Sequence, residues 1–341
     1  MISLSSHVRA RAPRRLVSAV TAAFRLMGFS KGPANKPLKL RDRDFVLPKI
    51  VRLHPAPHYL AVVAVVKNEA LYLQEWLDFH CLVGCSHFYI YDNGSTDGTA
   101  DILRRYERKG VVTPIPWPDF MPWPALIHHS TFQVPAYAHA LAAFGKLCRW
   151  MMFIDADEFV FPAFTDNLKQ ELATYEDLPA LALPWHMFGS SGHETPPSGL
   201  VIENYTERAV LPPVSKRLIK SKSVVDPTRV RAPGVHRFVL KEGRLIFTQN
   251  RQPMRDPDWK FIAPSENDKI VLNHYFSKSV EEAQRRAALC EKSASDWRTP
   301  GQTLARRQKI INAIESKLVE DRRIQRFLPR LKALRQVNGQ A

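Results

Sequence analysis

Three acidic side chains lie within four residues of one another near the middle of the chain. The segment RWMMFIDADEFVFP, residues 149–162, is apolar up to Ile154 and continues with Asp155, Asp157 and Glu158. Carboxylates that end a buried strand repel one another and lose hydration, so their charge requires compensation. Asp155 and Asp157 alternate with a small residue and can converge on one hard cation, for which Mg²⁺ or Mn²⁺ is suited. We therefore expect a divalent cation here.

Strand and helix patterns alternate before these acids. The expected strands are 59–66, 86–92, 111–115 and 149–155, and the expected helices between them are 67–84, 95–110 and 135–148. The first strand is a continuous apolar run rich in β-branched residues, which indicates burial on both faces. Strands and helices with such short connections predict an α/β fold, a mostly parallel sheet flanked by helices.

Polar residues follow several of these strands. In a parallel sheet, ligands bind beyond the carboxyl ends of the strands. The first strand is followed by Lys67, Asn68 and Glu69, and the second ends at Asp92 and Asn93. Together with the acids after residue 154, these side chains are expected at one edge of the sheet. Three strands that deliver polar groups to one edge predict a binding site.

The pattern is looser beyond residue 160. Residues 180–199 are expected to form a strand and a glycine-rich loop, and residues 200–280 short strands with Pro-rich turns. Helices are expected from Ser277 or Ser279 onward, over about 302–319 and over 321–336. We therefore divide the chain into a leader with linker (1–45), a main domain (46–280) and a C-terminal helical extension (281–341).

The formal charge of +16 is concentrated at the two ends of the chain. Residues 1–40 carry +8 and residues 281–341 carry +7, which leaves +1 for the body between them. Positive charge concentrated at the two ends of the chain favours contact with an anionic partner. Residues 13–27 have the pattern of a basic amphipathic helix on a membrane surface, although a disordered leader fits as well. We expect a cytoplasmic protein with peripheral contact to the inner face of the membrane.

Other classes of protein fit the sequence less well. The basic ends lack interleaved aromatic residues and any known nucleic-acid module, so no nucleic acid is expected, although binding to one or to another anionic surface is an alternative. The four cysteines form no metal-type grouping with histidines. A metal-dependent phosphodiesterase is a second alternative, but its two-metal sites need a denser set of His and Asp.

Four segments resemble motifs of glycosyltransferases of the GT-A fold, in particular families 2 and 92. These segments are VVAVVKNEALYLQEWLDFH, FYIYDNGSTDGT, WMMFIDADEF and NHYFSKS, and the resemblance covers about residues 58–290. It implies a Rossmann-like catalytic domain that transfers a sugar of hexosyl type from a nucleotide-sugar donor. A UDP-sugar is the first donor expected. The acceptor would be a glycan or a lipid-linked molecule.

The resemblance also implies the residues that hold the donor. The nucleotide pocket would be lined by Lys67, Asn68 and Glu69. The base or ribose would be held by Asp92 and Asn93.

The remaining implied roles concern the metal and the diphosphate. Asp155 and Asp157 would bind Mn²⁺ or Mg²⁺, with Glu158 in support. His274 would lie near the metal or diphosphate, and Lys278 would neutralise phosphate charge.

The catalytic base is less defined. Inverting transfer needs a carboxylate that takes the proton of the acceptor hydroxyl. The usual acidic motif of family 2 is not evident, and the loop FGSSGHE, residues 188–194, occupies the corresponding part of the chain. We expect Glu194 to be the base, with His193 as the substitute, in a mechanism that inverts. A retaining mechanism is the open alternative.

Several further residues have two interpretations. Asp97 is expected at a helix terminus, and Trp76, Trp150 and His80 in the core. Three residues remain divided between a structural and a substrate-facing role, namely Glu75, Gln133 and His236.

Overall fold

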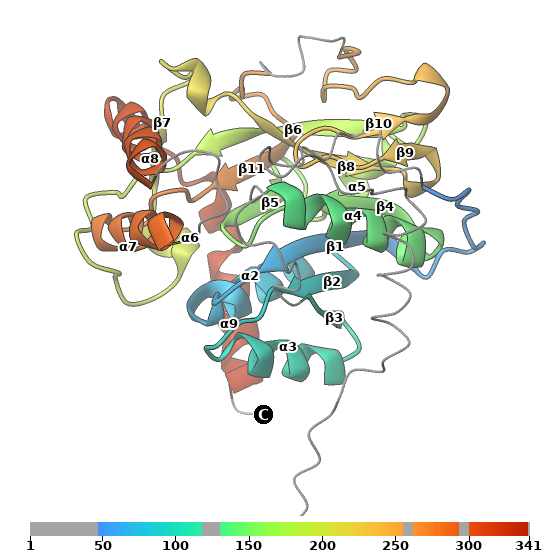
Figure 1. The fold of residues 1–341 in the computed structure, drawn as a ribbon, viewed down its shortest axis with the longest axis horizontal. Coiled ribbons are helices and arrows are strands. Elements are labelled where there is room, and N and C mark those ends of the chain that lie inside the picture. The colour runs from blue at the N-terminus through green and yellow to red at the C-terminus, as the bar shows by residue number, and fades with distance from the viewer. Residues whose placement is uncertain (1–46, 118–129, 255–261, 293–299, 340–341) are drawn as a thin grey trace, which may run out of the picture.

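An eight-stranded mixed sheet forms the centre of the computed structural model, which describes residues 47–117, 130–254, 262–292 and 300–339 (Figure 1). The strand order is β3-β2-β1-β4-β8-β6-β11-β5. Its strands are β1 (His58–Val66), β2 (His87–Asp92), β3 (Val112–Pro116), β4 (Cys148–Phe153), β5 (Glu158–Pro162), β6 (Ala180–Met187), β8 (Ser221–Val225) and β11 (Ile270–His274). The predicted basic leader lies outside the described residues.

The first half of the sheet is parallel, as the sequence predicted. β3, β2, β1 and β4 run in one direction and are joined by α2 (Ala70–Leu82), α3 (Thr99–Arg108) and α4 (Ser130–Phe144). The second half is mixed, because β8 is antiparallel to both β4 and β6, and β5 is antiparallel to β11. The α/β class, with a sheet flanked by helices, is confirmed.

β1 packs on both of its faces, which explains why its sequence is apolar throughout. Leu60 and Val62 belong to a core that includes residues of α2 and α3, whereas Ala61 and Val63 belong to a core that includes α4. All four side chains are fully buried. Successive residues of a strand point to opposite faces, so a strand covered on both sides has no polar alternation.

The connection between β4 and β5 requires the sheet to curl. These strands are four positions apart in the sheet, which is about 19 Å in a flat sheet, but only residues 154–157 join them. Those residues turn, since Glu158 N donates to Asp155 O at 3.1 Å. A turn of this length cannot cross a flat sheet, because even an extended chain gains only about 3.5 Å per residue. The sheet therefore brings β8, β11 and β5 close to the end of β4.

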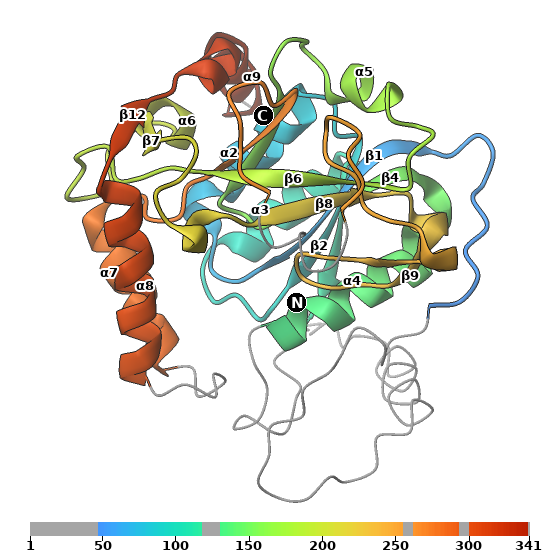
Figure 2. The same ribbon diagram turned by 90° about the horizontal axis from the view of Figure 1, so that it is seen from above.

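The C-terminal segments pack against the rest of the chain (Figures 1 and 2). α7 (Val280–Lys292) and α8 (Pro300–Glu315) lie side by side, and α9 (Leu328–Gly339) packs on α2. β12 (Leu318–Glu320) pairs with β7 (Glu207–Ala209) where the sequence predicted helix. The proposed division into three parts stays a prediction. No helix of the described residues is long and apolar enough to cross a membrane.

The remaining elements are short. They are α5 (Leu168–Ala173), α6 (Val201–Asn204), the paired strands β9 (Val230–Ala232) and β10 (Val239–Leu240), and 3₁₀ turns at 145–147, 216–218, 227–229, 241–243 and 323–327.

Glu75 connects α2 to the chain after the glycine-rich loop. Its two carboxylate oxygens accept hydrogen bonds from Val201 N at 2.8 Å and Ile202 N at 3.1 Å. The side chain is buried, and this burial raises the pKa of Glu75 to about 7. Of the two interpretations left open for this residue, the structure shows the structural one.

Replacing Glu75 with alanine is expected to lower the free energy of unfolding by about 2–4 kcal/mol, because two buried backbone N–H groups lose their acceptors. Denaturant titration followed by circular dichroism measures this loss. Gln74→Ala, the neighbouring change on the same helix, is the control and is expected to cost about 0.5 kcal/mol or less. Equal losses in the two variants would contradict the assigned role.

Candidate active site

The two aspartates after β4 have different partners. Asp155 Oδ1 accepts a hydrogen bond from Gln133 Nε2 at 2.9 Å, and its Oδ2 accepts one from Lys222 Nζ at 2.7 Å. Gln133 comes from α4 and Lys222 from β8, which lies next to β4 in the sheet. Asp155 is thus held by two neighbouring elements. Gln133 contacts the acid cluster, which consists of Asp155, Asp157 and Glu158.

Lys222 is a buried cation between two carboxylates. Its side chain is fully buried, and its Nζ lies 3.7 Å from Glu158 Oε2 in addition to its contact with Asp155. Burial lowers the pKa of Lys222, but the two carboxylates outweigh burial and raise it above its usual value. Lys222 therefore stays charged and compensates the acids. Sequence analysis missed it, because a single lysine in the strand SKSVV forms no motif.

Glu158 fixes the turn between β4 and β5. Its Oε2 accepts a hydrogen bond from Asp155 N at 2.8 Å, and its position in β5 pairs with His274 of β11. Burial raises the pKa of Glu158 well above its usual value. Glu158 therefore holds the backbone of Asp155, and its supporting role at a metal stays a prediction.

Asp157 faces a second group of cations. Its Oδ2 accepts a hydrogen bond from Arg286 NH1 at 2.6 Å, and its Oδ1 lies 3.6 Å from His274 Nε2. Arg286, on α7, also lies 3.8 Å from Glu69 Oε1. Burial raises the pKa of Asp157, but the charges of His274 and Arg286 outweigh it, and the pKa falls well below its usual value. Asp157 is therefore an anion that is contacted from β11, through His274, and from α7, through Arg286.

Lys278 is a buried cation whose ammonium group faces Tyr72. Its Nζ lies 3.9 Å from the centroid of the Tyr72 ring and has no hydrogen-bond partner among the described residues. Its φ of 52° is a left-handed conformation that non-glycine residues rarely adopt. Burial lowers the pKa of Lys278 to about 8. The backbone at Lys278 is therefore strained. Its ammonium group can still donate hydrogen bonds to a ligand.

The residues predicted to hold the nucleotide form a connected network at the ends of β1 and β2. Lys67 Nζ lies 3.5 Å from Asn93 Oδ1, and Asn93 Nδ2 donates to Trp117 O at 3.1 Å. Asn68, with a φ of 56°, accepts a hydrogen bond from Thr96 N at 2.7 Å. The edge predicted from the parallel strands is thus present.

Two acids shape the loops of this network. Asp92 Oδ1 accepts from Ser95 N at 3.0 Å. Asp97 accepts from Ala70 N at 3.0 Å and from Thr99 N at 2.9 Å, so it connects the beginnings of α2 and α3. The expectation that Asp97 is a helix-terminus residue is confirmed. Glu69 N donates to Thr99 Oγ1 at 2.9 Å, which places Glu69 at the same corner.

The two residues expected to supply the base make contacts elsewhere. His193 Nε2 lies 3.2 Å from Asn204 O, and its carbonyl accepts from Val280 N. Glu194 is exposed, and its carbonyl accepts from Glu281 N at the start of α7. Across the described parts of the chain, no hydrogen bond or ion pair joins either side chain to the acid cluster. Their assignment as catalytic base stays a prediction.

Trp76, Trp150 and His80 are core residues, whereas His236 is half-buried. Trp76 and Trp150 are fully buried. His80 is also fully buried, with Nδ1 at 2.8 Å from Trp76 O and Nε2 accepting from Val160 N at 3.1 Å. These three expectations are confirmed. His236 packs edge-on against Trp185 and lies 3.1 Å from Ser221 O.

The side chains near Asp157 include possible ligands of a divalent cation. Within the described residues, no three His, Cys, Asp or Glu side chains are grouped as a metal site. However, Asp157 Oδ1 and His274 Nε2 face each other at 3.6 Å, and carboxylate oxygen with imidazole nitrogen suits Mn²⁺. A metal bound together with a nucleotide is usually held by one or two protein donors, and the diphosphate and water supply its other ligands. Asp157 and His274 fit such an ion and would hold it, and the expectation that Asp155 is also a ligand stays a prediction.

Comparison with known proteins identifies the family. The sequence profile of glycosyltransferase family 92 matches residues 61–288, which is more than half of the chain. The chain therefore belongs to glycosyltransferase family 92.

Similar proteins of this family occur in plants. A family 92 protein of Oryza sativa subsp. japonica is 30% identical over 211 residues, which are 58% of this chain and 34% of the rice protein. One of Arabidopsis thaliana is 28% identical over 200 residues, 54% of this chain and 32% of that protein. The chain spans about a third of the length of these relatives.

Solved structures show a more distant likeness. S. aureus TarS in complex with UDP is 15% identical, with 75% of this chain and 72% of that chain covered and a TM-score of 0.33. Glucosyl-3-phosphoglycerate synthase from Mycobacterium tuberculosis, in complex with Mn²⁺, UDP-glucose and phosphoglyceric acid, is 18% identical, with coverages of 54% and 66% and a TM-score of 0.29. Likenesses this low do not bear on the site.

Replacing Lys222 with methionine is expected to lower the free energy of unfolding by about 3 kcal/mol, because it leaves two carboxylates without their buried cation. Denaturant titration measures the loss. Lys216→Met, an exposed lysine before the same strand, is the matched control and should change stability by about 0.5 kcal/mol or less. If Lys222→Met were as stable as the control, Lys222 would not be the compensating charge.

Proposed function

We propose that this protein is a divalent-metal-dependent glycosyltransferase that moves a hexosyl group from a nucleoside diphosphate sugar to a glycan or lipid-linked acceptor. A UDP-sugar is the first donor proposed. The observation that supports this most is the arrangement around Asp157. A metal-type pair, Asp157 with His274, lies beside two cations, the half-buried Arg286 and the buried Lys278.

The charges of the site suit a departing diphosphate. Lys278 has no hydrogen-bond partner among the described residues, and the half-buried Arg286 lies between Asp157 and Glu69. Fixed cations in a site that excludes water stabilise developing negative charge without reorganising. When bound, Mn²⁺ or Mg²⁺ would neutralise further charge on the same diphosphate. Asp157 and His274 would hold the ion there.

The role proposed for Asp155 differs from that of Asp157. The two oxygens of Asp155 are engaged by Gln133 and Lys222, which hold the carboxylate in one orientation, while about a third of the side chain stays exposed. We propose that Asp155 supports the metal and donor from this fixed position. Lys67, Asn68, Glu69, Asp92 and Asn93 would line the nucleotide pocket, as the resemblance implies.

The other parts of the proposal concern the chemistry at the acceptor. We propose an inverting transfer, for which Glu194, or His193 in its place, is the proposed base. A phosphodiesterase is less well supported, because the described residues offer two metal donors rather than the larger set that two-metal hydrolysis uses.

Isothermal titration calorimetry with UDP, GDP, CMP and ADP, each with and without Mn²⁺, tests the donor proposal. We expect one diphosphate nucleotide to bind in the presence of Mn²⁺ and to lose affinity on chelation. Asp157→Asn should weaken this binding at least about 10-fold, because it removes one of two protein ligands of the ion.

The control for this experiment is Asp166→Asn, an exposed acid that is not part of the cluster. It should bind like the wild type. Absence of binding to every nucleotide in a folded wild-type protein would overturn the proposed function. Binding that is independent of Mn²⁺ would overturn its metal dependence alone.

We further propose that the protein works at the inner face of an anionic membrane, and this rests on the charge of +8 in residues 1–40. Sedimentation with anionic vesicles at low salt should remove the full chain from solution, and 150 mM salt should weaken the binding by screening. A chain without residues 1–40 should stay in solution. Equal binding of both chains, or none by the full chain, would contradict the proposal.

A further inference from the structure

A pocket is lined by residues of α7 and α8, by Ser190 of the loop after β6 and by Ser277. Its volume is about 460 Å³, within the range of about 300–1,000 Å³ that is typical of small-molecule sites. The residues that line it are Ser190, Ser277, Val280, Ala283, Gln284, Leu304, Arg307, Gln308, Ile311 and Glu315. Nothing in the site described so far uses these side chains.

One lining residue is a buried polar group without a partner. Ser277 is 2% exposed, and its Oγ has no hydrogen-bond partner among the described residues. Ser279 caps α7 instead, because its Oγ accepts from Glu282 N at 3.3 Å while Glu282 Oε2 accepts from Ser279 N at 3.1 Å. Ser277 is therefore not needed for the helix. A buried hydroxyl left unpaired costs free energy unless a ligand or water completes it.

The pocket is connected to the acid cluster through Phe276. The Arg307 guanidinium lies 4.8 Å from the centroid of the Phe276 ring, and that ring packs edge-on against His274 at 5.5 Å. Lys278, proposed to face the diphosphate, is the next residue after Ser277. The Phe276 ring therefore lies between Arg307 of the pocket and His274 of the candidate site.

The wall formed by the glycine-rich loop is fixed to α8. Glu315 Oε1 accepts a hydrogen bond from Ser190 N at 2.7 Å. A Cβ atom on Gly189 would lie 2.7 Å from the same oxygen, so a larger residue there would require the Glu315 side chain to move. The loop, which sequence analysis singled out, thus has a defined position against the pocket.

The lining chemistry suits a neutral sugar. Val280, Leu304 and Ile311 offer apolar surface for the C–H face of a sugar ring, and the amides of Gln284 and Gln308 offer hydrogen bonds for hydroxyls. The charges of Arg307 and Glu315 offset each other, which disfavours a strongly charged ligand.

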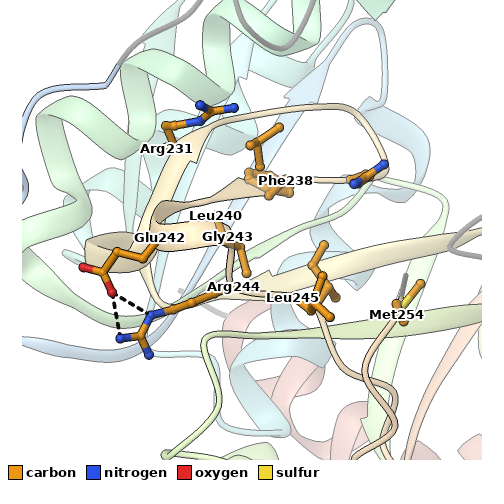
Figure 3. Close-up of a pocket in the computed structure, with 11 residues that line it drawn as sticks. Arg231, Phe238, Leu240, Glu242, Gly243, Arg244, Leu245 and Met254 are labelled. Atoms are coloured by element: carbon orange, nitrogen blue, oxygen red, sulfur yellow. Dashed lines mark hydrogen bonds and ion pairs between the residues drawn. The ribbon is translucent and has the colours of Figure 1, made fainter. Parts of the chain in front are cut away.

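A second pocket has a different set of charged lining residues. It has a volume of about 270 Å³, lies at β9 and β10, and shares no lining residue with the first (Figure 3). Arg231 and Arg244 line it, and Arg244 is paired with Glu242. It has no contact with Phe276 that would connect it to the site.

We propose that the pocket between α7, α8 and residues 188–194 binds the acceptor, as a neutral sugar unit of a glycan. This inference rests on the proposed function and names the acceptor class for the same site. Ser277, Gln284 and Arg307 hold the hydroxyls of that sugar, and Ile311 contacts its ring.

Methyl NMR of the full chain, labelled at isoleucine, leucine, valine and alanine methyl groups, tests the proposal. The probes are the methyl glycosides of glucose, galactose and mannose, added in the millimolar range. We expect at least one of them to shift the Ile311 methyl signals. Gln284→Ala should weaken that glycoside about fivefold, which corresponds to the loss of one neutral hydrogen bond.

Arg306→Ala, an exposed arginine on the same helix, is the matched control for Arg307→Ala and should leave the titration unchanged. The proposal is overturned if no glycoside shifts Ile311, or if Gln284→Ala and Arg307→Ala bind like the wild type. Calorimetry of nucleotide binding on the same samples separates the two proposals. A protein that binds its nucleotide but no glycoside contradicts only the acceptor pocket, whereas one that binds no nucleotide contradicts the proposed function.

Discussion

The short connection between β4 and β5 is the constraint on which the rest of the site depends. Four residues join two strands that are four positions apart in the sheet, so the sheet has to curl around residues 154–157. The curl places the end of β11 beside those residues, so His274 reaches Asp157 from a strand that a flat sheet would hold farther away. Lys222 reaches Asp155 from β8, the direct neighbour of β4.

This constraint also explains the pairing of charges. The turn concentrates three carboxylates in a partly buried place, and each would be costly there without a cation. Lys222 compensates Asp155 and Glu158, and Arg286 compensates Asp157. The two aspartates are consequently not equivalent. Both oxygens of Asp155 accept hydrogen bonds from protein donors, whereas Oδ1 of Asp157 faces the imidazole of His274.

The C-terminal segments complete the site as well as the core. α7 supplies Arg286 to the acid cluster, and α7 and α8 together supply most of the lining of the proposed acceptor pocket. The loop at 188–194 lies between them and the sheet, where Glu315 and Ser190 join it to α8. Donor and acceptor sites would thus share one helix, so that α7 relates their positions to each other.

The parallel half of the sheet and its polar edge could be predicted from local patterns. β1 to β4 and α2 to α4 have local patterns of burial, and Lys67 to Glu69, Asp92 and Asn93 lie where parallel strands end. The cations that pair with the acids could not be predicted in this way, because they come from distant segments of the chain. Lys222 lies 67 residues from Asp155, and Arg286 lies 129 residues from Asp157. No local periodicity carries such pairings, because they arise when the curl of the sheet and the packing of α7 bring distant segments together.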